Sequence, residues 1–207
     1  MYRFLQHVMF LLALASVTAC SAVQVQDYAD NQPALNPESF FDGQLSAHGV
    51  IKDRGGKVTR YFNVAIKAYW RDGVGTLEED FVFNDGEQDR RVWTLTPAGK
   101  DRYIGTAGDV VGDGAISIAG NSMFLDYVLR IPYGDGTLDL HIDDRMYLVS
   151  PDVLINESRM IKFGFSVGEI LLVIRREPEP SAPQAQVRPI NSTVTQPGPA
   201  VYAPLAG

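Results

Sequence analysis

The feature that most constrains this chain is an alternation of apolar and polar side chains between residues 57 and 71. The apolar side chains occupy even positions: Val58, Phe62, Val64, Ile66, Ala68 and Trp70. The polar side chains occupy odd positions: Lys57, Thr59, Asn63, Lys67 and Arg71. Because successive side chains of an extended strand point to opposite faces, a period of two predicts a β-strand with one apolar and one solvent-facing side.

The same pattern continues to residue 176 and predicts a series of strands separated by turns. The expected strands are 43–51, 57–71, 76–84, 90–96, 102–111, 115–119, 123–131, 138–148, 153–165 and 169–176. Several of the intervening segments are rich in Gly, Asp and Asn, which favour tight turns, and no helical period extends over three turns. We therefore predict an all-β fold, an antiparallel up-and-down meander that closes into a barrel of eight to ten strands and so removes exposed strand edges.

Composition excludes some classes of function. The chain has 207 residues, a net charge of −7 and one cysteine, Cys20. The length fits one domain with appendages. An acidic chain argues against binding nucleic acid, which requires clustered Lys and Arg, and against docking on anionic lipid through a basic patch. A single cysteine excludes an intrachain disulfide, so the domain depends on its core for stability.

The amino-terminal residues 1–19 have the form of a secretory signal, with Arg3 in the positive region and an apolar run at 8–15. One interpretation is an ordinary signal peptide that is cut and lost. However, the sequence V-T-A-C that ends at Cys20 resembles the lipobox of bacterial lipoproteins, in which the thiol receives a diacylglyceryl group and cleavage occurs just before it. We expect lipid on Cys20 to anchor the protein in the membrane. By resemblance to enteric sorting rules, Ser21 favours the outer membrane, facing the periplasm.

These features divide the chain into four expected parts. They are a lipoprotein signal peptide at 1–19, a lipidated cysteine and tether at 20–36, a barrel domain at 37–176 and a Pro-rich disordered tail at 177–207. The tail holds seven of the 12 prolines and has almost no apolar pattern, which predicts an extended, disordered segment. It is either an inert extension or a docking segment for a partner.

Six motifs follow one another in the body of the chain. They are F-F-D-G at 40–43, T-L-E-E-D-F-V-F at 76–83, R-V-W-T-L at 91–95, Y-I-G-T-A-G-D-V-V-G at 103–112, D-D-R-M-Y-L-V at 143–149 and N-E-S-R-M-I-K-F-G-F at 156–165. Together they resemble signatures of one bacterial lipoprotein family, filed as domain of unknown function three-eight-three-three. The resemblance spans residues 35–176, and the family usually has Trp where this chain has Arg145. It implies a lipocalin-like barrel in the cell envelope and leaves the activity open.

The sequence carries no recognisable catalytic, metal or cofactor motif. After the signal only two histidines remain, His48 and His141, on different predicted strands, so we expect no transition-metal site. Neither a G-x-S-x-G elbow nor a G-x-G-x-x-G loop followed by a helix occurs. We therefore expect no catalytic residues, no cofactor and no metal.

Three charged residues lie two positions from apolar residues on predicted strands, so their side chains are expected on the apolar face. They are the candidate ligand contacts: Arg60, Glu79 and Asp144. Because an unpaired buried charge is costly, each should be paired, hydrated or near a mouth of the barrel. One interpretation is an internal ion-pair network, or bulges that turn these residues outward. Another is a polar contact for a ligand head group, with Arg60 suited to a carboxylate or phosphate. A paired-carboxylate hydrolase is a third.

The size of the inward side chains bears on function, since a small barrel holds either its own side chains or one small ligand. Large inward candidates are Phe62, Trp70, Phe81, Phe83, Tyr127 and Met146. Small ones that would leave space are Ala68, Gly105, Ala107 and Ala119. We expect a membrane-anchored, non-enzymatic protein that binds or shields an apolar small molecule, such as a lipid with fatty acyl chains. The alternatives are an envelope structural or interaction module with a filled core, and an enzyme acting on a lipid.

Overall fold

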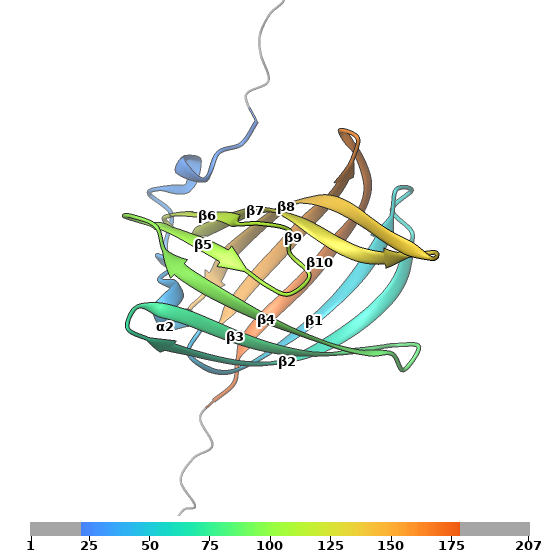
Figure 1. The fold of residues 1–207 in the computed structure, drawn as a ribbon. Coiled ribbons are helices and arrows are strands. Elements are labelled where there is room, and N and C mark those ends of the chain that lie inside the picture. The colour runs from blue at the N-terminus through green and yellow to red at the C-terminus, as the bar shows by residue number, and fades with distance from the viewer. Residues whose placement is uncertain (1–21, 179–207) are drawn as a thin grey trace, which may run out of the picture. The chain divides into compact units, whose positions relative to one another are not determined.

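The computed structural model describes residues 22–178, in which ten antiparallel strands form one closed barrel (Figure 1). The strands are β1 (Gly43–Asp53), β2 (Val58–Arg71), β3 (Val74–Phe83), β4 (Gln88–Pro97), β5 (Arg102–Thr106), β6 (Gly114–Ala119), β7 (Ser122–Tyr133), β8 (Gly136–Ser150), β9 (Val153–Lys162) and β10 (Phe165–Arg176). Two short helices precede them, η1 (Val25–Tyr28) and α2 (Pro37–Phe40). Each strand pairs with its neighbours in sequence, and β1 pairs with β10 to close the barrel. The predicted all-β meander and its closure are confirmed.

One predicted strand is shorter than expected. β5 ends at Thr106, whereas the sequence predicts a strand to residue 111. Beyond it, the 107–113 segment runs irregularly and lies along β7, where the backbone N–H of Val111 donates to the carbonyl oxygen of Val128 at 2.8 Å. This segment contains two glycines and two aspartates, residues that are unfavourable in strands.

A second predicted strand, 153–165, is divided by a turn. β9 ends at Lys162, and Phe163 and Gly164 turn the chain into β10 with φ angles of 51° and 80°. The alternation of apolar residues continues across this turn, so it did not reveal the boundary.

The core of the barrel consists of the inward positions that the alternation predicts. Among the large candidates, Phe62 and Tyr127 are buried, and the other four are partly buried against the same core. Phe62, Phe81 and Phe83 form an aromatic cluster with ring centroids 6.0, 5.9 and 6.1 Å apart. Gly49 on β1 makes room for this cluster, because a Cβ atom there would lie 2.4 Å from the Phe62 ring.

One end of the barrel is covered by the residues that precede β1, drawn in blue in Figure 1. Phe40 and Phe41 are 3% and 2% exposed. The indole N–H of Trp70 donates to the carbonyl oxygen of Phe41 at 2.8 Å, which fixes α2 to β2. Asn36 caps α2 by accepting a hydrogen bond from the Ser39 N–H at 3.2 Å.

The predicted tether, residues 20–36, is corrected by the structure from Val25 onward. Val25 and Leu35 are 7% and 5% exposed, and the Leu35 N–H donates to the carbonyl oxygen of Gly120 at 2.8 Å. Gly120 has φ of 52°, and a Cβ atom there would lie 1.8 Å from the Tyr28 carbonyl oxygen, so glycine permits this close contact. Two isolated apolar residues in a polar segment form no period, and the sequence pattern therefore could not show that they pack.

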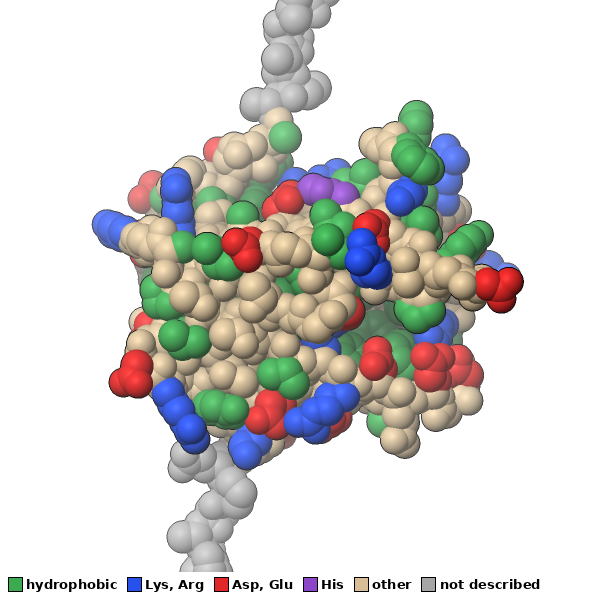
Figure 2. Space-filling view, in the orientation of Figure 1, with side chains coloured by type: hydrophobic (Ala, Val, Ile, Leu, Met, Phe, Trp, Pro, Cys, Tyr) green, Lys and Arg blue, Asp and Glu red, His purple; other side chains and the backbone are tan. Residues whose placement is uncertain are grey.

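The wall of the barrel is incomplete between β4 and β7. β5 pairs with only the last four residues of β4, and β6 pairs with β7 only as far as Asp126. Farther from the covered end, the 107–113 segment lies along β7 and forms one bridge, between Val110 and Leu129. We call this opening the lateral gap. Figure 2 shows the molecule hollowed on this side, between the β3–β4 and β7–β8 hairpins, with hydrophobic side chains inside.

Candidate functional site

Four titratable side chains from four strands face the interior of the barrel. Glu79 alternates with apolar residues on β3, and Arg91 occupies the position directly opposite it on β4. Tyr127 on β7 and Asp144 on β8 are 7% and 6% exposed. We call these four residues the interior polar cluster. The period of two that buries their apolar neighbours also directs them inward.

The interior polar cluster lines a cavity of about 120 Å³ inside the barrel. Most of the other lining residues are apolar, among them Phe62, Phe81, Trp93, Leu125, Met146 and Leu172. A second cavity of about 50 Å³ is lined by Phe41 at the covered end and shares Glu79 and Trp93 with the first. Glu79 therefore borders both cavities.

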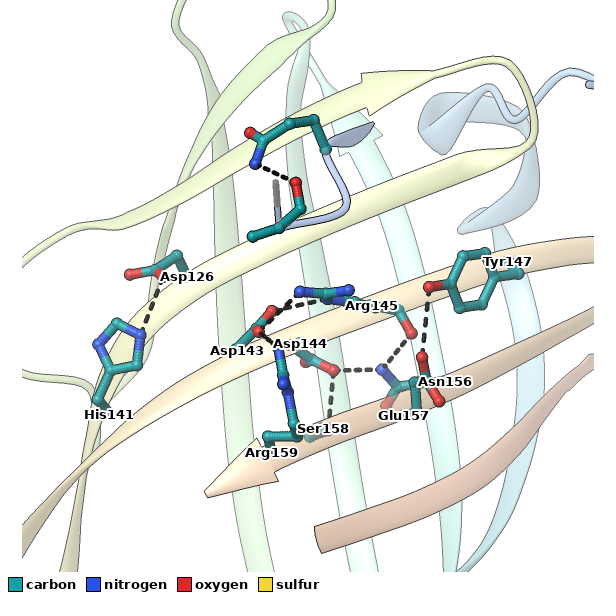
Figure 3. A network of polar contacts seen from close by, with 12 residues as sticks. Asp126, His141, Asp143, Asp144, Arg145, Tyr147, Asn156, Glu157, Ser158 and Arg159 are labelled. Carbon is teal, nitrogen blue, oxygen red and sulfur yellow. Dashed lines mark hydrogen bonds and ion pairs between the residues drawn. The ribbon is translucent and has the colours of Figure 1, made fainter. Parts of the chain in front are cut away.

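Asp144 is held by two donors from β9. Ser158 Oγ donates to Asp144 Oδ1 at 2.8 Å, and Asn156 Nδ2 donates to the same oxygen (Figure 3). Burial raises the pKa of Asp144 to about 6, although these two hydrogen bonds oppose the rise. Within residues 22–178 no hydrogen bond reaches Oδ2, the second oxygen of this carboxyl group.

Glu79 and Tyr127 bring unpartnered polar groups to the cavity. Neither the Glu79 carboxyl group nor the Tyr127 hydroxyl group forms a hydrogen bond or ion pair with another of the described residues, and both line the cavity. In that part of the chain the only fully enclosed side-chain polar atom without a partner is Nε of Arg60. The oxygens of Glu79 and Tyr127 therefore keep accessible surface toward the cavity.

The pKa values of both groups reflect their surroundings. Burial raises the pKa of Glu79 to about 7, and the charges of Asp109 and Asp144 add to the rise whereas Arg91 opposes it. Burial also raises the pKa of the Tyr127 hydroxyl group above its ordinary value. At neutral pH the cavity thus contains a neutral phenol and a carboxyl group whose protonated form burial favours.

Arg91 is bound by an aspartate of the 107–113 segment, beside the lateral gap. Its Nε donates to the two carboxylate oxygens of Asp109 at 3.1 and 2.9 Å, and its Nη2 donates at 2.6 Å. The guanidinium carbon also lies 5.6 Å from the Phe81 ring centre and 6.0 Å from that of Trp93. Because Asp109 balances its charge, Arg91 adds little net positive charge to the cavity.

Two of the three predicted site residues, Glu79 and Asp144, are brought together by the structure. Both line the same cavity, and the charge of Asp144 contributes to the raised pKa of Glu79. Their neighbours Arg91, Asn156 and Ser158 were not among the predicted residues. Each of these three lies two positions from an apolar residue on its own strand. The alternation therefore also predicted that their side chains face the interior.

The third predicted residue, Arg60, lies by the β3–β4 turn rather than at this cavity. Its Nη2 donates to the two carboxylate oxygens of Asp85 at 3.0 and 2.9 Å and to Glu87 at 2.9 Å. Its guanidinium carbon lies 3.8 Å from the centre of the Phe83 ring. Arg60 is thus engaged in an ion-pair network at the end of the barrel opposite α2.

Asp143, next to Asp144 in sequence, belongs to a separate network. Arg145 donates to both of its carboxylate oxygens at 3.0 Å, and Arg159 donates as well (Figure 3). Burial acts to raise the pKa of Asp143, but these hydrogen bonds outweigh it and hold the pKa below its usual value. Arg145, at the position of the Trp in the resemblance, packs over the ring of Phe124 at 5.1 Å. Adjacent strand residues face opposite sides, so only Asp144 enters the cavity.

Residues 22–178 contain neither a metal-binding cluster nor a membrane-spanning helix. No three His, Cys, Asp or Glu side chains of this range lie together as ligands. None of its helices is long and apolar enough to cross a bilayer.

Ten closed antiparallel strands around a small cavity define this protein as a lipocalin-like β-barrel with a polar cluster inside. The chain belongs to the family described as "Protein of unknown function (DUF3833)", whose model matches residues 14–176. This match confirms the family that the six sequence motifs resemble.

Two solved structures are similar to the barrel at low sequence identity. An S-type phycobiliprotein lyase from Guillardia theta is 10% identical with a TM-score of 0.50, and the match covers 70% of this chain and 95% of the lyase. A DUF3598-family protein of unknown function from Nostoc punctiforme is 14% identical with a TM-score of 0.50, over 71% of this chain and 51% of its own. At these identities the likeness shows the fold alone. No curated protein matches the chain in sequence.

Proposed function

We propose that this protein is an envelope lipoprotein whose barrel binds an amphipathic small molecule, a lipid, with its polar group at the interior polar cluster. The observation that carries the proposal is a cavity with mainly apolar walls in which the Glu79 carboxyl and Tyr127 hydroxyl groups have no hydrogen-bond partner among residues 22–178. Buried polar groups are nearly always hydrogen-bonded, and an unsatisfied one costs about 1–3 kcal/mol. A molecule with a polar group beside an apolar chain would satisfy both kinds of surface.

The volume of the cavity limits how much of the ligand is enclosed. A volume of about 120 Å³ corresponds to roughly four molecules of liquid water, below the roughly 300 Å³ of a typical small-molecule site. The enclosed space therefore suits a head group or the end of a chain. The rest of the ligand would leave through the lateral gap, past the apolar rings of Phe81 and Trp93.

The anchor supports a ligand drawn from a membrane. Cys20 and residues 1–19 lie outside the described residues, so lipidation, the outer membrane and the periplasm remain parts of this proposal. Four residues separate Cys20 from Val25, which is packed on the barrel. At about 3.5 Å per extended residue, this linker would hold the barrel within roughly 20 Å of the membrane.

Arg60 remains a proposed ligand contact at the end of the barrel opposite α2. Its Nε is enclosed and has no acceptor among the described residues. An acceptor group of a ligand that extended toward this end would satisfy it.

A second candidate function, an interaction module of the envelope, is favoured by a groove of about 450 Å³. The outer faces of four neighbouring strands line it, with Val50 on β1, Tyr61 on β2, Val82 on β3 and Leu171 on β10. Tyr61, Val82 and Leu171 are 57%, 47% and 40% exposed. Exposed apolar side chains gathered in one groove suit a protein partner.

The third candidate is an enzyme acting on a lipid. A carboxyl group with a pKa near neutrality, such as Glu79, suits general acid–base catalysis. The similar lyase is an enzyme by its name, but at 10% identity it supports the fold and not the activity. The binding experiment below therefore also follows whether the extracted molecule is converted.

The test uses the mature chain, residues 20–207, produced without the signal and with Cys20→Ser to prevent acylation. Molecules that co-purify are extracted and identified by mass spectrometry, and their rebinding and turnover are followed. We expect a lipid in the unmodified barrel and its loss in Glu79→Leu. Glu78→Gln is the matched control, because Glu78 is adjacent in sequence, faces outward and pairs with Arg90.

Absence of any bound molecule, together with no saturable binding of acyl-chain probes to the folded protein, would contradict the proposal. The interaction module would then replace it. Conversion of the extracted molecule would favour the enzyme instead.

A separate experiment tests the anchor. We expect Cys20→Ser in the full-length chain to abolish acylation and to leave the protein uncleaved at this site or released from the membrane. Wild-type protein recovered from the periplasm without lipid would contradict this part of the proposal.

A further inference from the structure

We infer that the interior cavity takes a ligand group that donates hydrogen bonds or carries positive charge, such as an amine or a hydroxyl, in preference to a carboxylate or phosphate. The inference rests on the proposed function and specifies the chemistry of its ligand. It differs from the carboxylate or phosphate head group for which the sequence made Arg60 the candidate contact.

The first argument is the balance of charge around Glu79. The groups that face it are Arg91 from β4, Asp109 from the 107–113 segment, Tyr127 from β7 and Asp144 from β8. Counting Glu79 itself, three carboxyl groups stand against one guanidinium group, and Asp109 already binds that guanidinium group. An anion entering the cavity would meet excess negative charge where water screens little, whereas a cation would neutralise it.

The second argument is the balance of donors and acceptors. Ser158 and Asn156 already donate to Asp144, and Nε and Nη2 of Arg91 already donate to Asp109. The acceptors left open are both oxygens of Glu79 and Oδ2 of Asp144, and an ionised carboxylate only accepts. The donor hydrogens left open are two on Nη1 and one on Nη2 of Arg91 and that of the Tyr127 hydroxyl group. The three open oxygens can accept about six hydrogen bonds, more than these four hydrogens supply, so a complementary ligand brings donors.

The third argument is the separation of Arg60 from the cavity. The residue best suited to an anionic head group is bound by Asp85 and Glu87. A carboxylate at Glu79 would therefore meet only the guanidinium group of Arg91, whose charge Asp109 already balances.

The experiment compares three ligands with the same apolar chain: decylamine, decanol and decanoate. Their binding to the mature chain with Cys20→Ser is measured by titration calorimetry at pH 7.5, below the concentrations at which they aggregate. We expect decylamine to bind at least about tenfold more tightly than decanoate, with decanol between them. Because burial raises the pKa of Glu79 to about 7, the affinity for decylamine should also increase from pH 6 to pH 8.

Matched variants locate the effect. In Glu79→Gln the affinity for decylamine should fall about tenfold and depend less on pH, while that for decanol changes little. The dependence that is left would come from Asp144, whose pKa burial raises to about 6. Glu78→Gln, on the outer face, should behave as the unmodified protein, since an equal loss there would indicate attraction to the acidic surface. Asp144→Asn provides a second interior variant if Glu79→Gln does not fold.

The outcomes separate the two proposals. Equal binding of all three ligands, or tightest binding of decanoate, would overturn this inference and leave the proposed function intact. Saturable binding of none of them would overturn both.

Discussion

At the scale of single residues, Phe163 holds a backbone conformation that bulky residues avoid. Its φ is 51° at the β9–β10 turn, and its side chain is 87% exposed, so packing compensates little for the strain. Asn adopts this conformation more readily, and Asn-Gly favours two-residue hairpins. We expect Phe163→Asn to raise the free energy of unfolding by about 0.5–1 kcal/mol in urea denaturation.

Phe165→Asn is the control for this prediction. It changes the same side chain at an exposed strand position, where Asn is unfavourable, and should not stabilise the protein. A loss of stability in Phe163→Asn would indicate that the contact between the Lys162 ammonium and the Phe163 ring, at 5.0 Å, stabilises the turn.

Glu79 and Asp144 predict how stability depends on pH. Burial raises their pKa values to about 7 and about 6 in the folded barrel, above the values of 4.5 and 3.8 that such carboxyl groups ordinarily have. The folded state therefore binds more protons than the unfolded state, and the free energy of unfolding should fall as the pH rises from about 5 to 8. Glu79 alone would contribute a fall of about 3 kcal/mol at most.

Urea denaturation at a series of pH values measures this dependence. In Glu79→Gln the slope between pH 5 and pH 8 should become shallower, while the outward-facing control Glu78→Gln should retain it. Stability that increases over this range in the unmodified protein would show that the two carboxyl groups are not desolvated as described.

At the scale of elements, the 107–113 segment replaces a strand in the wall of the barrel. It is attached by few backbone hydrogen bonds, among them one from the Arg130 N–H to the Asp109 carbonyl oxygen at 2.8 Å. The ion pair between the Asp109 carboxylate and Arg91 fixes it to β4. Because this ion pair lies beside the lateral gap, it is suited to control access to the cavity.

Weakening this ion pair should open the gap without unfolding the barrel. We expect Asp109→Asn to lower the free energy of unfolding by about 1–3 kcal/mol, since Arg91 would keep its charge in a half-buried site. Hydrogen exchange should accelerate at the amides of Val111 and Arg130 more than in β1 and β2. Asp113→Asn in the same segment is the control, because Asp113 forms no ion pair with the described residues. Equal acceleration in the control would show that the ion pair does not hold the segment.

At the scale of the whole molecule, the chain before β1 completes the core at the covered end. Phe41 is 2% exposed, lines the smaller cavity and accepts the Trp70 hydrogen bond. We expect Phe41→Ala to lower the free energy of unfolding by about 3–5 kcal/mol, through lost apolar burial and an enlarged cavity. Thermal and urea denaturation test this expectation, and a loss below about 1 kcal/mol would show that the covered end contributes little to the core.

We expect the carboxyl-terminal tail, in contrast, to contribute almost nothing to stability. Its residues 179–207 lie outside the described part of the chain. Glu177 still belongs to the barrel, because its N–H donates to the carbonyl oxygen of Gln44 at 2.9 Å. Deleting residues 178–207 should change the melting temperature by less than about 2 °C, since Pro-rich sequence buries little apolar surface. A decrease of several degrees would show that the tail packs on the folded domain.

Much of the site was predictable from single strands. The alternation that predicts inward side chains for Glu79 and Asp144 does the same for Arg91, which alternates with Trp93 and Leu95. The position of Asp109 was not predictable in this way, because it lies in an irregular segment without alternation. The polar partners of Asp144 lie on a different strand, and their contact depends on register.

The sequence by itself determined most of the strands, their antiparallel order and the face that each side chain on a strand takes, because the period of two is a local property of an extended chain. It also determined which charges point inward. Only the tertiary structure decided which of these charges meet, because register and closure depend on contacts between residues distant in sequence. Those contacts placed Glu79 beside Asp144, separated Arg60 from both, and packed Val25 and Leu35 on the barrel.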